Sequence, residues 1–311
     1  MTRSVTQVYG ITQPVPFLDV NVDSDNQLFL DPNAIRNGGD TYSRRGHDQL
    51  VDFFSEVLMC ARSNNATLRA KGERLLQSMH EPNETRLGYT RHGSKGHGFA
   101  EGMGTRLWSE IRANPTLHSG TGTGMSIQAA VLLRLERVPL FIKRVDRDMI
   151  SDLTTRITFN VLADFTTHMM STYPTLANGA VTRTHDVWDN SISDLTSAPI
   201  TLPAVDGKQL LLVPTYWVFW RLVMDPESFY NRYATQVIQD EQTIYGSDGK
   251  PSKPTKASIK NQNPDHKGTN VRQATKYARE QDRDLAGEYE AEIDELFEPM
   301  DVDEIQRRLP D

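Results

Sequence analysis

Apolar residues recur along much of the chain at the three-to-four spacing of an amphipathic helix. This spacing occurs in four segments, which are residues 48–62, residues 67–79, residues 126–138 and a stretch that begins near Asp152. Asp48 is expected to cap the first of these helices, and Pro139 to end the third. Asp225-Pro226 predicts the start of a further helix, because aspartate favours the N-cap and proline the first helical position.

Strand-like runs occur in two places. Residues 15–22 and 27–30 are joined by Asp-Ser-Asp-Asn, which favours a turn and predicts an N-terminal hairpin. Residues 200–205 and 208–213 flank Asp206-Gly207, a dipeptide typical of a tight hairpin turn. Together with the helices, these runs predict an α+β fold in which helices pack on a mixed or antiparallel sheet, followed by a C-terminal helical tail.

The balance of charge changes sharply in the C-terminal part of the chain. Eight Lys and Arg stand against one acid, Asp265, in residues 250–279, whereas residues 280–311 carry thirteen acids against three Arg. The first stretch is polar and poor in apolar residues, and the second regains apolar residues at helical spacing. The predicted division is a body of residues 1–245, a basic flexible linker of residues 246–270 and an acidic amphipathic helical tail of residues 271–311.

The overall composition excludes several classes of protein. The chain has 311 residues, a formal net charge of −7 and a single cysteine, Cys60. One cysteine can form neither a disulfide framework nor a cysteine-based zinc site within the chain, and the helical run around Cys60 favours a buried, inert thiol. The sequence shows no signal peptide and no long apolar run, so a cytoplasmic protein with no membrane partner is expected.

Glycine and charge gather in the segment that begins at Glu81. Glycines let backbone N–H groups approach an anion closely, and neighbouring Lys or Arg side chains can then hold a phosphate. Arg86, Arg91 and Lys95 are therefore candidates for binding phosphate, while Glu81 and Glu84 are candidate catalytic carboxylates. The alternative interpretation is a surface loop whose glycines serve only its turns.

Other carboxylates are candidates for a site that holds Mg²⁺ or Mn²⁺, since both ions prefer oxygen ligands. Asp146 and Asp152 follow a basic run, and we assign Asp146 to the metal and Asp152 to catalysis. Asp19 and Asp31 are expected to approach each other across the N-terminal hairpin and to be further metal ligands. The alternative is that such residues cap helices or lie in solvent.

The spacing of the remaining residues argues against other chemistries. The glycine segment does not end in the Gly-Lys-Ser/Thr of a P-loop, and no buried strand precedes it, so there is no nucleotide cofactor motif. The histidines form no ligand set, and no zinc is expected. A restriction-type nuclease would need Asp194 together with Asp206 on a strand, but Asp206-Gly207 is better explained as a turn.

Four blocks of sequence carry a resemblance. They are Leu28-Phe29-Leu30-Asp31-Pro32, Glu81 to Gly88, Ile150-Ser151-Asp152 and Leu210 to Pro214. In this order they resemble a group of uncharacterised bacterial proteins with no established activity, so the resemblance implies no catalytic role. The group has a lysine after the Val-Pro pair where this chain has Thr215. The blocks are polar and lie at predicted loops and strand ends, which is more typical of a site than of packing.

Two functions are therefore expected as alternatives. The first is a metal-assisted, nuclease-like enzyme that processes nucleic acid or another phosphoester as a Mg- or Mn-dependent hydrolase, with bacterial defence as one setting for it. The second is a non-catalytic interaction subunit that binds a partner protein or a second copy through its acidic C-terminal helix.

Overall fold

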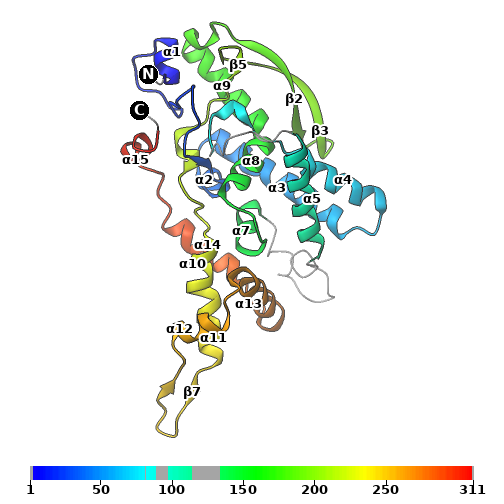
Figure 1. Cartoon of the computed structure of the whole chain (residues 1–311), viewed down its shortest axis with the longest axis vertical. Helices are drawn as coiled ribbons and strands as arrows, with labels where there is room; N and C mark the ends of the chain where they lie inside the picture. The colour runs from blue at the N-terminus through cyan, green and yellow to red at the C-terminus, as the bar shows by residue number, and fades with distance from the viewer. Residues whose placement is uncertain (1–2, 81, 89–96, 114–133, 310–311) are drawn as a thin grey trace. The chain divides into compact units, whose positions relative to one another are not determined.

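The computed structural model of the chain describes residues 3–80, 82–88, 97–113 and 134–309 (Figure 1). The chain forms two compact units. Unit 1 comprises Met1–Trp108, Asp146–Val223 and Glu298–Asp311, and unit 2 comprises Ser109–Val145 and Met224–Phe297. These boundaries differ from the expected ones at residues 245 and 270, because each unit draws on segments that are far apart in the sequence.

Helices make up most of unit 1. They are α1 (Val5–Tyr9), α2 (Pro32–Asn37), α3 (Thr41–Arg62), α4 (Ala66–Gln77), α8 (Arg147–Ile157), α9 (Phe159–Thr172), α15 (Val302–Gln306), the short 3₁₀ turns η1 (Asn83–Thr85), η4 (Pro174–Ala177) and η5 (Thr215–Trp217), and the first part of α5 (His97–Ala113). Helix α8 contacts α3, α9 and the strand β2 described below. Its residues Ile150 and Ile157 are at most 1% exposed, so α8 lies in the core of the unit.

The N-cap of α3 lies further upstream than the pattern predicts. Asp40, not Asp48, caps the helix, and its side chain accepts from the backbone N–H groups of Tyr42 and Ser43 at 2.8 and 3.2 Å. The apolar stripe starts at Leu50, so hydrophobic periodicity alone missed the polar first turns of the helix.

In the part of the chain that the structure describes, every sheet is a two-stranded antiparallel pair, which confirms the α+β class together with the packed helices. The longest pair, β2 (Val181–Asp189) with β3 (Asp194–Leu202), was not predicted as a hairpin. Most of its residues are exposed or half-buried on both faces, so the sequence lacks the apolar-polar alternation that marks a strand. The pair β4 (Ala204–Val205) with β5 (Lys208–Gln209) confirms the Asp206-Gly207 turn, where both central residues have positive φ, 51° and 74°.

The expected N-terminal hairpin is wrong. Strand β1 (Phe29–Leu30) pairs with β6 (Val218–Phe219), and residues 15–22 form no strand. Instead Phe17 makes an isolated antiparallel bridge with Pro214, and Leu18 N donates to Val213 O at 2.8 Å. Both apolar runs therefore found partners far along the chain, which a local turn signal cannot reveal.

The end of the glycine segment forms a helix. Gly102 and Gly104 lie inside α5, which begins at His97. A Cβ on Gly104 would lie 2.5 Å from the backbone carbonyl group of Leu76, so this glycine allows α5 to pack closely on α4. A Cβ on Gly102 would meet nothing within 4 Å.

The described residues of unit 2 form helices and one short hairpin. Its elements are the end of α5, η3 (Leu135–Arg137), α7 (Val138–Phe141), α10 (Pro226–Phe229), the π-helical turn η6 (Tyr230–Ala234), α11 (Thr235–Glu241), β7 (Ile244–Tyr245), β8 (Pro251–Ser252), α12 (Lys256–Gln262), α13 (His266–Gln281) and α14 (Leu285–Glu295). Asp225 caps α10 as predicted. Pro139, expected to end a helix, instead lies in the first turn of α7, where it costs no hydrogen bond.

Two helices occupy the stretch for which a flexible linker was expected. Thr255 caps α12 and Asp265 caps α13, and each side chain accepts from a backbone N–H group. Ile259 and Ala274 are at most 2% exposed, so few apolar residues suffice to anchor both helices in unit 2.

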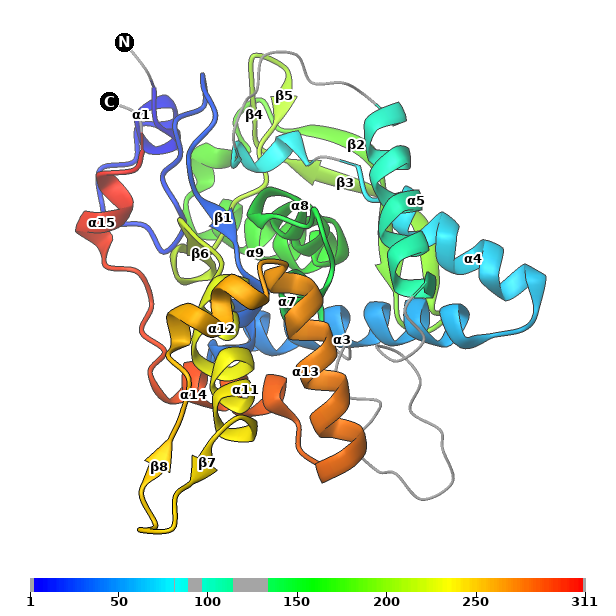
Figure 2. The ribbon, with the colours of Figure 1, turned by 60° about the horizontal axis from the view of Figure 1, so that its bottom comes forward.

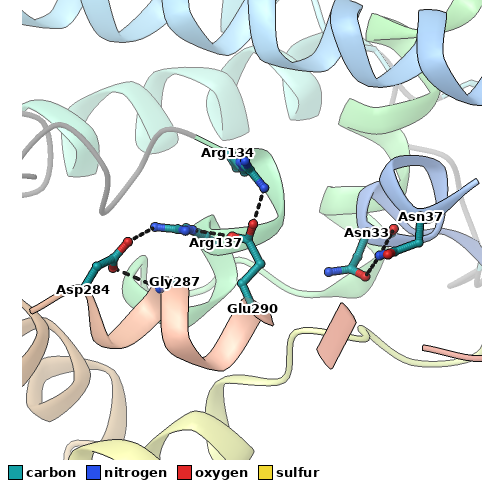
Figure 3. Close-up of polar contacts among 7 residues, drawn as sticks. All are labelled: Asn33, Asn37, Arg134, Arg137, Asp284, Gly287 and Glu290. Atoms are coloured by element: carbon teal, nitrogen blue, oxygen red, sulfur yellow. Dashed lines mark hydrogen bonds and ion pairs between the residues drawn. The ribbon is translucent and has the colours of Figure 1, made fainter. Parts of the chain in front are cut away.

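The predicted acidic helix is present as α14, and its apolar stripe is partly buried within unit 2. Leu285 and Tyr289 are 0% and 2% exposed, whereas Leu296 is 70% exposed. The carboxylate of Glu290 on α14 meets Arg134 and Arg137, and Asp284 meets Arg137 from the other side (Figure 3). The acidic helix thus has basic partners in its own unit.

Candidate functional site

Helix α8 brings three charged residues into one row. Asp148, Asp152 and Arg156 are four residues apart, so they share one face of the helix, and all three are half-buried. The helix begins at Arg147 because the exposed side chain of Asp146 caps it, accepting from Met149 N at 3.0 Å. Asp146 therefore caps a helix, which was the alternative to its role as a metal ligand.

The segment from Asn83 to Gly88 is fixed beside this row by backbone hydrogen bonds. Asn26, which is fully buried, donates from its backbone N to Arg86 O at 2.9 Å and accepts from Gly88 N at 3.0 Å. Leu211 N donates to Glu84 O at 2.9 Å. A Cβ on Gly88, whose φ is 116°, would lie 3.2 Å from Asp148 Oδ1. The segment therefore runs over the exposed side of α8.

These bonds also bring the four resembling sequence blocks together. Leu30 N donates to Ser151 Oγ at 3.0 Å, which links the first block to the third. The bond from Leu211 N to Glu84 O links the fourth to the second. Blocks that are far apart in sequence thus meet in unit 1, next to the core helix α8.

The side chain of Glu84 lies between a cation and an imidazole. Its carboxylate oxygens are 3.6 Å from Arg156 Nη2 and 3.9 Å from His185 Nδ1. The side chains of Glu84, Arg156 and His185 are 19%, 16% and 9% exposed. His185 stacks on the ring of Phe159 with a centroid distance of 4.6 Å, and the Arg156 guanidinium lies 5.3 Å from the centre of the same ring. We call Glu84, Arg156, Phe159, His185 and Gln209 the Glu84 cluster.

Gln209 determines which nitrogen of His185 carries a hydrogen. Gln209 Nε2 donates to Val181 O at 2.7 Å and Ile200 O at 3.1 Å, so its Oε1 is the atom that faces His185 Nε2 at 2.7 Å. His185 Nε2 must then be the donor, and in the neutral ring Nδ1 presents a lone pair toward Glu84. The carboxylate of Glu84 and the imidazole of His185 thus face each other within the cluster.

Two of the predicted metal ligands have partners of another kind. Asp19 accepts from Thr6 N at 2.8 Å and from Thr6 Oγ1 at 2.5 Å, next to the start of α1. Asp31 is 2% exposed and caps α2, accepting from Asn33 N and Val223 N at 2.8 Å each. Burial raises the pKa of Asp31 to about 6, although these N–H groups oppose the shift.

Asp19, Asp31 and Asp146 therefore serve three different elements, and the hairpin expected to join the first two does not exist. Among the residues that the structure describes, no three His, Cys, Asp or Glu side chains gather closely enough to hold a metal ion. Asp19, Asp31 and Asp146 instead accept hydrogen bonds from backbone N–H groups.

The predicted phosphate-binding and catalytic residues lie in different places, and three of them are outside the described residues. Arg86 ends η1 with a φ of 57°, and its Nη1 donates to Asn83 O at 3.0 Å. Burial lowers the pKa of Arg86, against the nearby charges of Asp25 and Glu84. Glu84 and Asp152 lie at the candidate site described above. The remaining three candidates, which are Glu81, Arg91 and Lys95, lie outside the described residues.

Sequence reasoning identified Glu84 and missed the other four members of the Glu84 cluster. His185 lies in β2, which lacks apolar alternation, and the histidines formed no motif. Gln209 lies in the predicted strand run of residues 208–213, where nothing marked its side chain as functional. Arg156 carried one usable signal, because it is four residues after Asp152 in a predicted helix and therefore on the same face.

Unit 1 also contains a cavity of about 520 Å³, and no member of the Glu84 cluster lines it. It is lined by Asp25, Gln27 and four residues of the C-terminal segment, which are Glu304, Arg307, Arg308 and Leu309. Arg308 also packs over the ring of Trp220, 4.3 Å from its centre. The cavity shows how the end of the chain packs in unit 1.

Fold and site together define an α+β protein with a shielded acid–histidine–arginine cluster on its core helix. The chain belongs to the family described as "Domain of unknown function (DUF8370)", which matches residues 10–224 and so includes every member of the cluster. This agrees with the resemblance to a group that has no established activity. No curated protein and no solved structure matches the chain significantly. Within the described residues, no helix is long and apolar enough to cross a membrane.

Proposed function

We propose that the chain is a nuclease-like enzyme that processes phosphoesters, with Glu84 and His185 as its acid–base pair. The observation that supports this most directly is the position of the Glu84 carboxylate, 3.9 Å from His185 Nδ1 and 3.6 Å from Arg156 Nη2. A carboxylate and an imidazole that lie this close together can deprotonate a nucleophile or protonate a leaving group, which is the requirement of general acid–base catalysis.

The cation of the cluster adds the second requirement of phosphoryl chemistry. Negative charge develops on the phosphoryl oxygens, and a guanidinium held in a water-poor site stabilises it well. Arg156 is 16% exposed and is fixed by its Nε bond to His80 O at 2.7 Å. Asp152, one turn earlier on α8, is assigned the role of orienting the substrate or its attacking water.

A dependence on Mg²⁺ or Mn²⁺ stays part of the proposal as a property to be measured. Asp19, Asp31 and Asp146 accept hydrogen bonds from backbone N–H groups, so no step of the mechanism is assigned to a metal. The chemistry assigned above uses only Glu84, His185, Arg156 and Asp152.

The test is turnover by the full chain. Wild-type protein is incubated with single- and double-stranded DNA, with RNA and with a chromogenic small phosphodiester, in Mg²⁺, in Mn²⁺ and in EDTA. Glu84→Gln and His185→Gln are expected to lower the rate about 100-fold or more, because each removes one member of the acid–base pair. Glu110→Gln, an exposed glutamate on α5, is the matched control and should keep the rate.

Thermal melting of each variant separates loss of chemistry from loss of fold. Absence of turnover of every substrate by the wild type in all three conditions would overturn the proposal. So would a folded Glu84→Gln variant with the wild-type rate.

The alternative proposal is a non-catalytic subunit that binds a protein partner or a second copy through its acidic helix. Its support is weaker, because Leu285 and Tyr289, which belonged to the expected docking stripe, are buried inside unit 2. The exposed Leu296 is what favours it. Deletion of residues after 295 with loss of a stoichiometric complex would support this alternative.

A further inference from the structure

The β7–β8 hairpin of unit 2 carries two large apolar side chains in solvent. Ile244 and Tyr245 are 72% and 70% exposed. Both belong to β7, which pairs with β8 through Ile244 opposite Ser252 and Tyr245 opposite Pro251. In both views of the ribbon the hairpin extends away from α11 and α12 of the same unit (Figures 1 and 2). Exposed apolar residues on a projecting element are characteristic of a contact surface.

Backbone hydrogen bonds within its turn hold the shape of the hairpin. Gly246 N donates to Lys250 O at 3.1 Å, and Gly249 N donates to Gly246 O at 2.9 Å with a φ of 73° at Gly249. At the base, Gln239 Nε2 donates to Pro254 O at 2.7 Å. Two strands of two residues have little stability of their own, so the bond from Gln239 of α11 helps to hold the hairpin in place.

The hairpin and α12 carry a strong excess of positive charge. Residues 244–262 contain four lysines and one acid, Asp248. Lys250 and Asp248 are 3.6 Å apart, but their side chains are 84% and 59% exposed, so this pair neutralises little in water. Lys253 is exposed and Lys260 is half-buried, while Lys256 Nζ donates to Asn231 O at 3.3 Å within the unit. Lys250, Lys253 and Lys260 are thus the cations available to a ligand.

The chemistry of the hairpin fits a nucleic acid better than an added protein strand. Pro251 and Pro254 have no backbone N–H to donate. Pro251 is the first residue of β8, and Pro254 comes two residues after the end of this strand. Pairing of a further strand along that edge is therefore disfavoured. An exposed aromatic ring flanked by lysines is instead the combination that stacks on a base and contacts the adjoining phosphates.

We propose that the hairpin arm, residues 244–253, together with Lys260 of α12, binds nucleic acid. Tyr245 stacks on an unpaired base, Ile244 adds an apolar contact, and the three lysines contact phosphates. This deepens the proposed function by naming nucleic acid as the substrate class, and it rests on that function only in calling the bound nucleic acid a substrate.

The test is binding of the full chain to fluorescently labelled oligonucleotides in EDTA, followed by anisotropy over a range of salt concentrations. Tyr245→Ala is expected to weaken binding of a single strand about 10-fold, the loss of one base stack. Lys250→Glu combined with Lys253→Glu is expected to weaken binding further and to reduce the slope of log K against log salt by about 1.4, since each phosphate contact on a single strand contributes about 0.7.

Matched controls come from exposed residues of unit 1. Ile192→Ala removes an apolar side chain that is 57% exposed, and Lys208→Glu reverses an exposed lysine at the β4–β5 turn. Both should bind like the wild type. Equal affinity of the Tyr245→Ala and wild-type proteins would overturn the inference, as would the absence of salt-dependent binding by the wild type.

The outcomes separate this inference from the proposed function. If the hairpin variants lose binding and no protein shows turnover, the hairpin arm is supported as a nucleic-acid-binding site and the proposed enzymatic function is ruled out. If turnover depends on Glu84 and the hairpin variants bind like the wild type, the enzymatic function is supported and nucleic-acid binding by the hairpin arm is ruled out.

Discussion

Arg137 Nε donates to Glu290 Oε2 at 2.7 Å, and each of these two side chains is only 7% exposed. Asp284 Oδ2 lies 3.0 Å from Arg137 Nη1, and Arg134 also pairs with Glu290 (Figure 3). Burial alone would lower the pKa of Arg137, but the carboxylates of Glu290 and Asp284 outweigh it and raise that pKa. The charged network joins α14 to η3 in the interior of unit 2.

Glu290→Ala is expected to destabilise unit 2 by about 3–5 kcal/mol. The substitution removes the carboxylate that contacts Arg137 Nε, and removing one partner of a buried ion pair is costly. Urea unfolding of the full chain, followed by circular dichroism, measures the change in the free energy of unfolding.

The control for this prediction is Glu288→Ala on the same helix. Glu288 pairs with Arg283 at 2.6 Å, but the two side chains are 39% and 45% exposed, so the expected loss is below about 1 kcal/mol. Both substitutions end in alanine within α14, so helix propensity changes equally. Similar losses in the two variants would show that burial of the Arg137 pair contributes little.

Gly104→Ala is expected to destabilise unit 1 by about 1–3 kcal/mol, because an added methyl group would overlap the backbone of Leu76 and force α5 away from α4. Gly102→Ala on the same helix meets open space and should stabilise the protein by about 0.5–1 kcal/mol. Melting temperatures of the two variants should therefore move in opposite directions. A shift of the same sign in both would contradict the close approach of the two helices.

These glycines illustrate what the sequence could and could not reveal. Local signals succeeded where one short segment decides the outcome, as in the Asp225 cap of α10 and the turn at Asp206-Gly207. The role of Gly104 depends on a neighbouring helix, so its sequence context suggested a loop. Partners from distant segments are invisible to such patterns.

The candidate site shows the same limit. Glu84 and Asp152 were predicted because acids and cations cluster around them in sequence. His185 was not, because it reaches Glu84 only through the packing of β2 on the core helices. The carboxylates assigned to a metal were selected by residue type, and residue type alone cannot distinguish a ligand from a helix cap such as Asp31.

Cys60 is expected to resist alkylation in the native protein. Its side chain is buried, and burial together with the nearby Glu56 carboxylate raises the pKa of the thiol to about 11. Because the thiolate is the reactive form, iodoacetamide at pH 8 should react roughly 100-fold more slowly than with an ordinary cysteine. Mass spectrometry at timed intervals follows the reaction.

The comparison for Cys60 uses the unfolded chain and an exposed position. The same protein in concentrated urea should be labelled rapidly, and Asn64→Cys, at an exposed site after α3, should add a second, rapidly labelled thiol. Native labelling of Cys60 at the rate of the added thiol would rule out the buried environment.

Asp31 should make the protein less stable as the pH rises from about 4 to about 7. Burial raises its folded-state pKa from 3.8 to about 6, so between these values the folded protein holds a proton that the unfolded chain has released. The stabilisation is complete below about pH 4 and is lost as the pH rises through about 6. The loss is at most about 3 kcal/mol, the equivalent of two pKa units.

Asp31→Asn removes this titration and keeps an oxygen that can cap α2. Its free energy of unfolding, relative to that of the wild type, should therefore rise as the pH increases from 4 to 7. Asp40→Asn is the control with the opposite sign. Burial alone would raise the pKa of Asp40, but hydrogen bonds from Ser43, Tyr216 and two backbone N–H groups lower it overall, so its stabilisation is lost as the pH falls. Parallel pH profiles for the two variants would show that the two caps do not differ in this way.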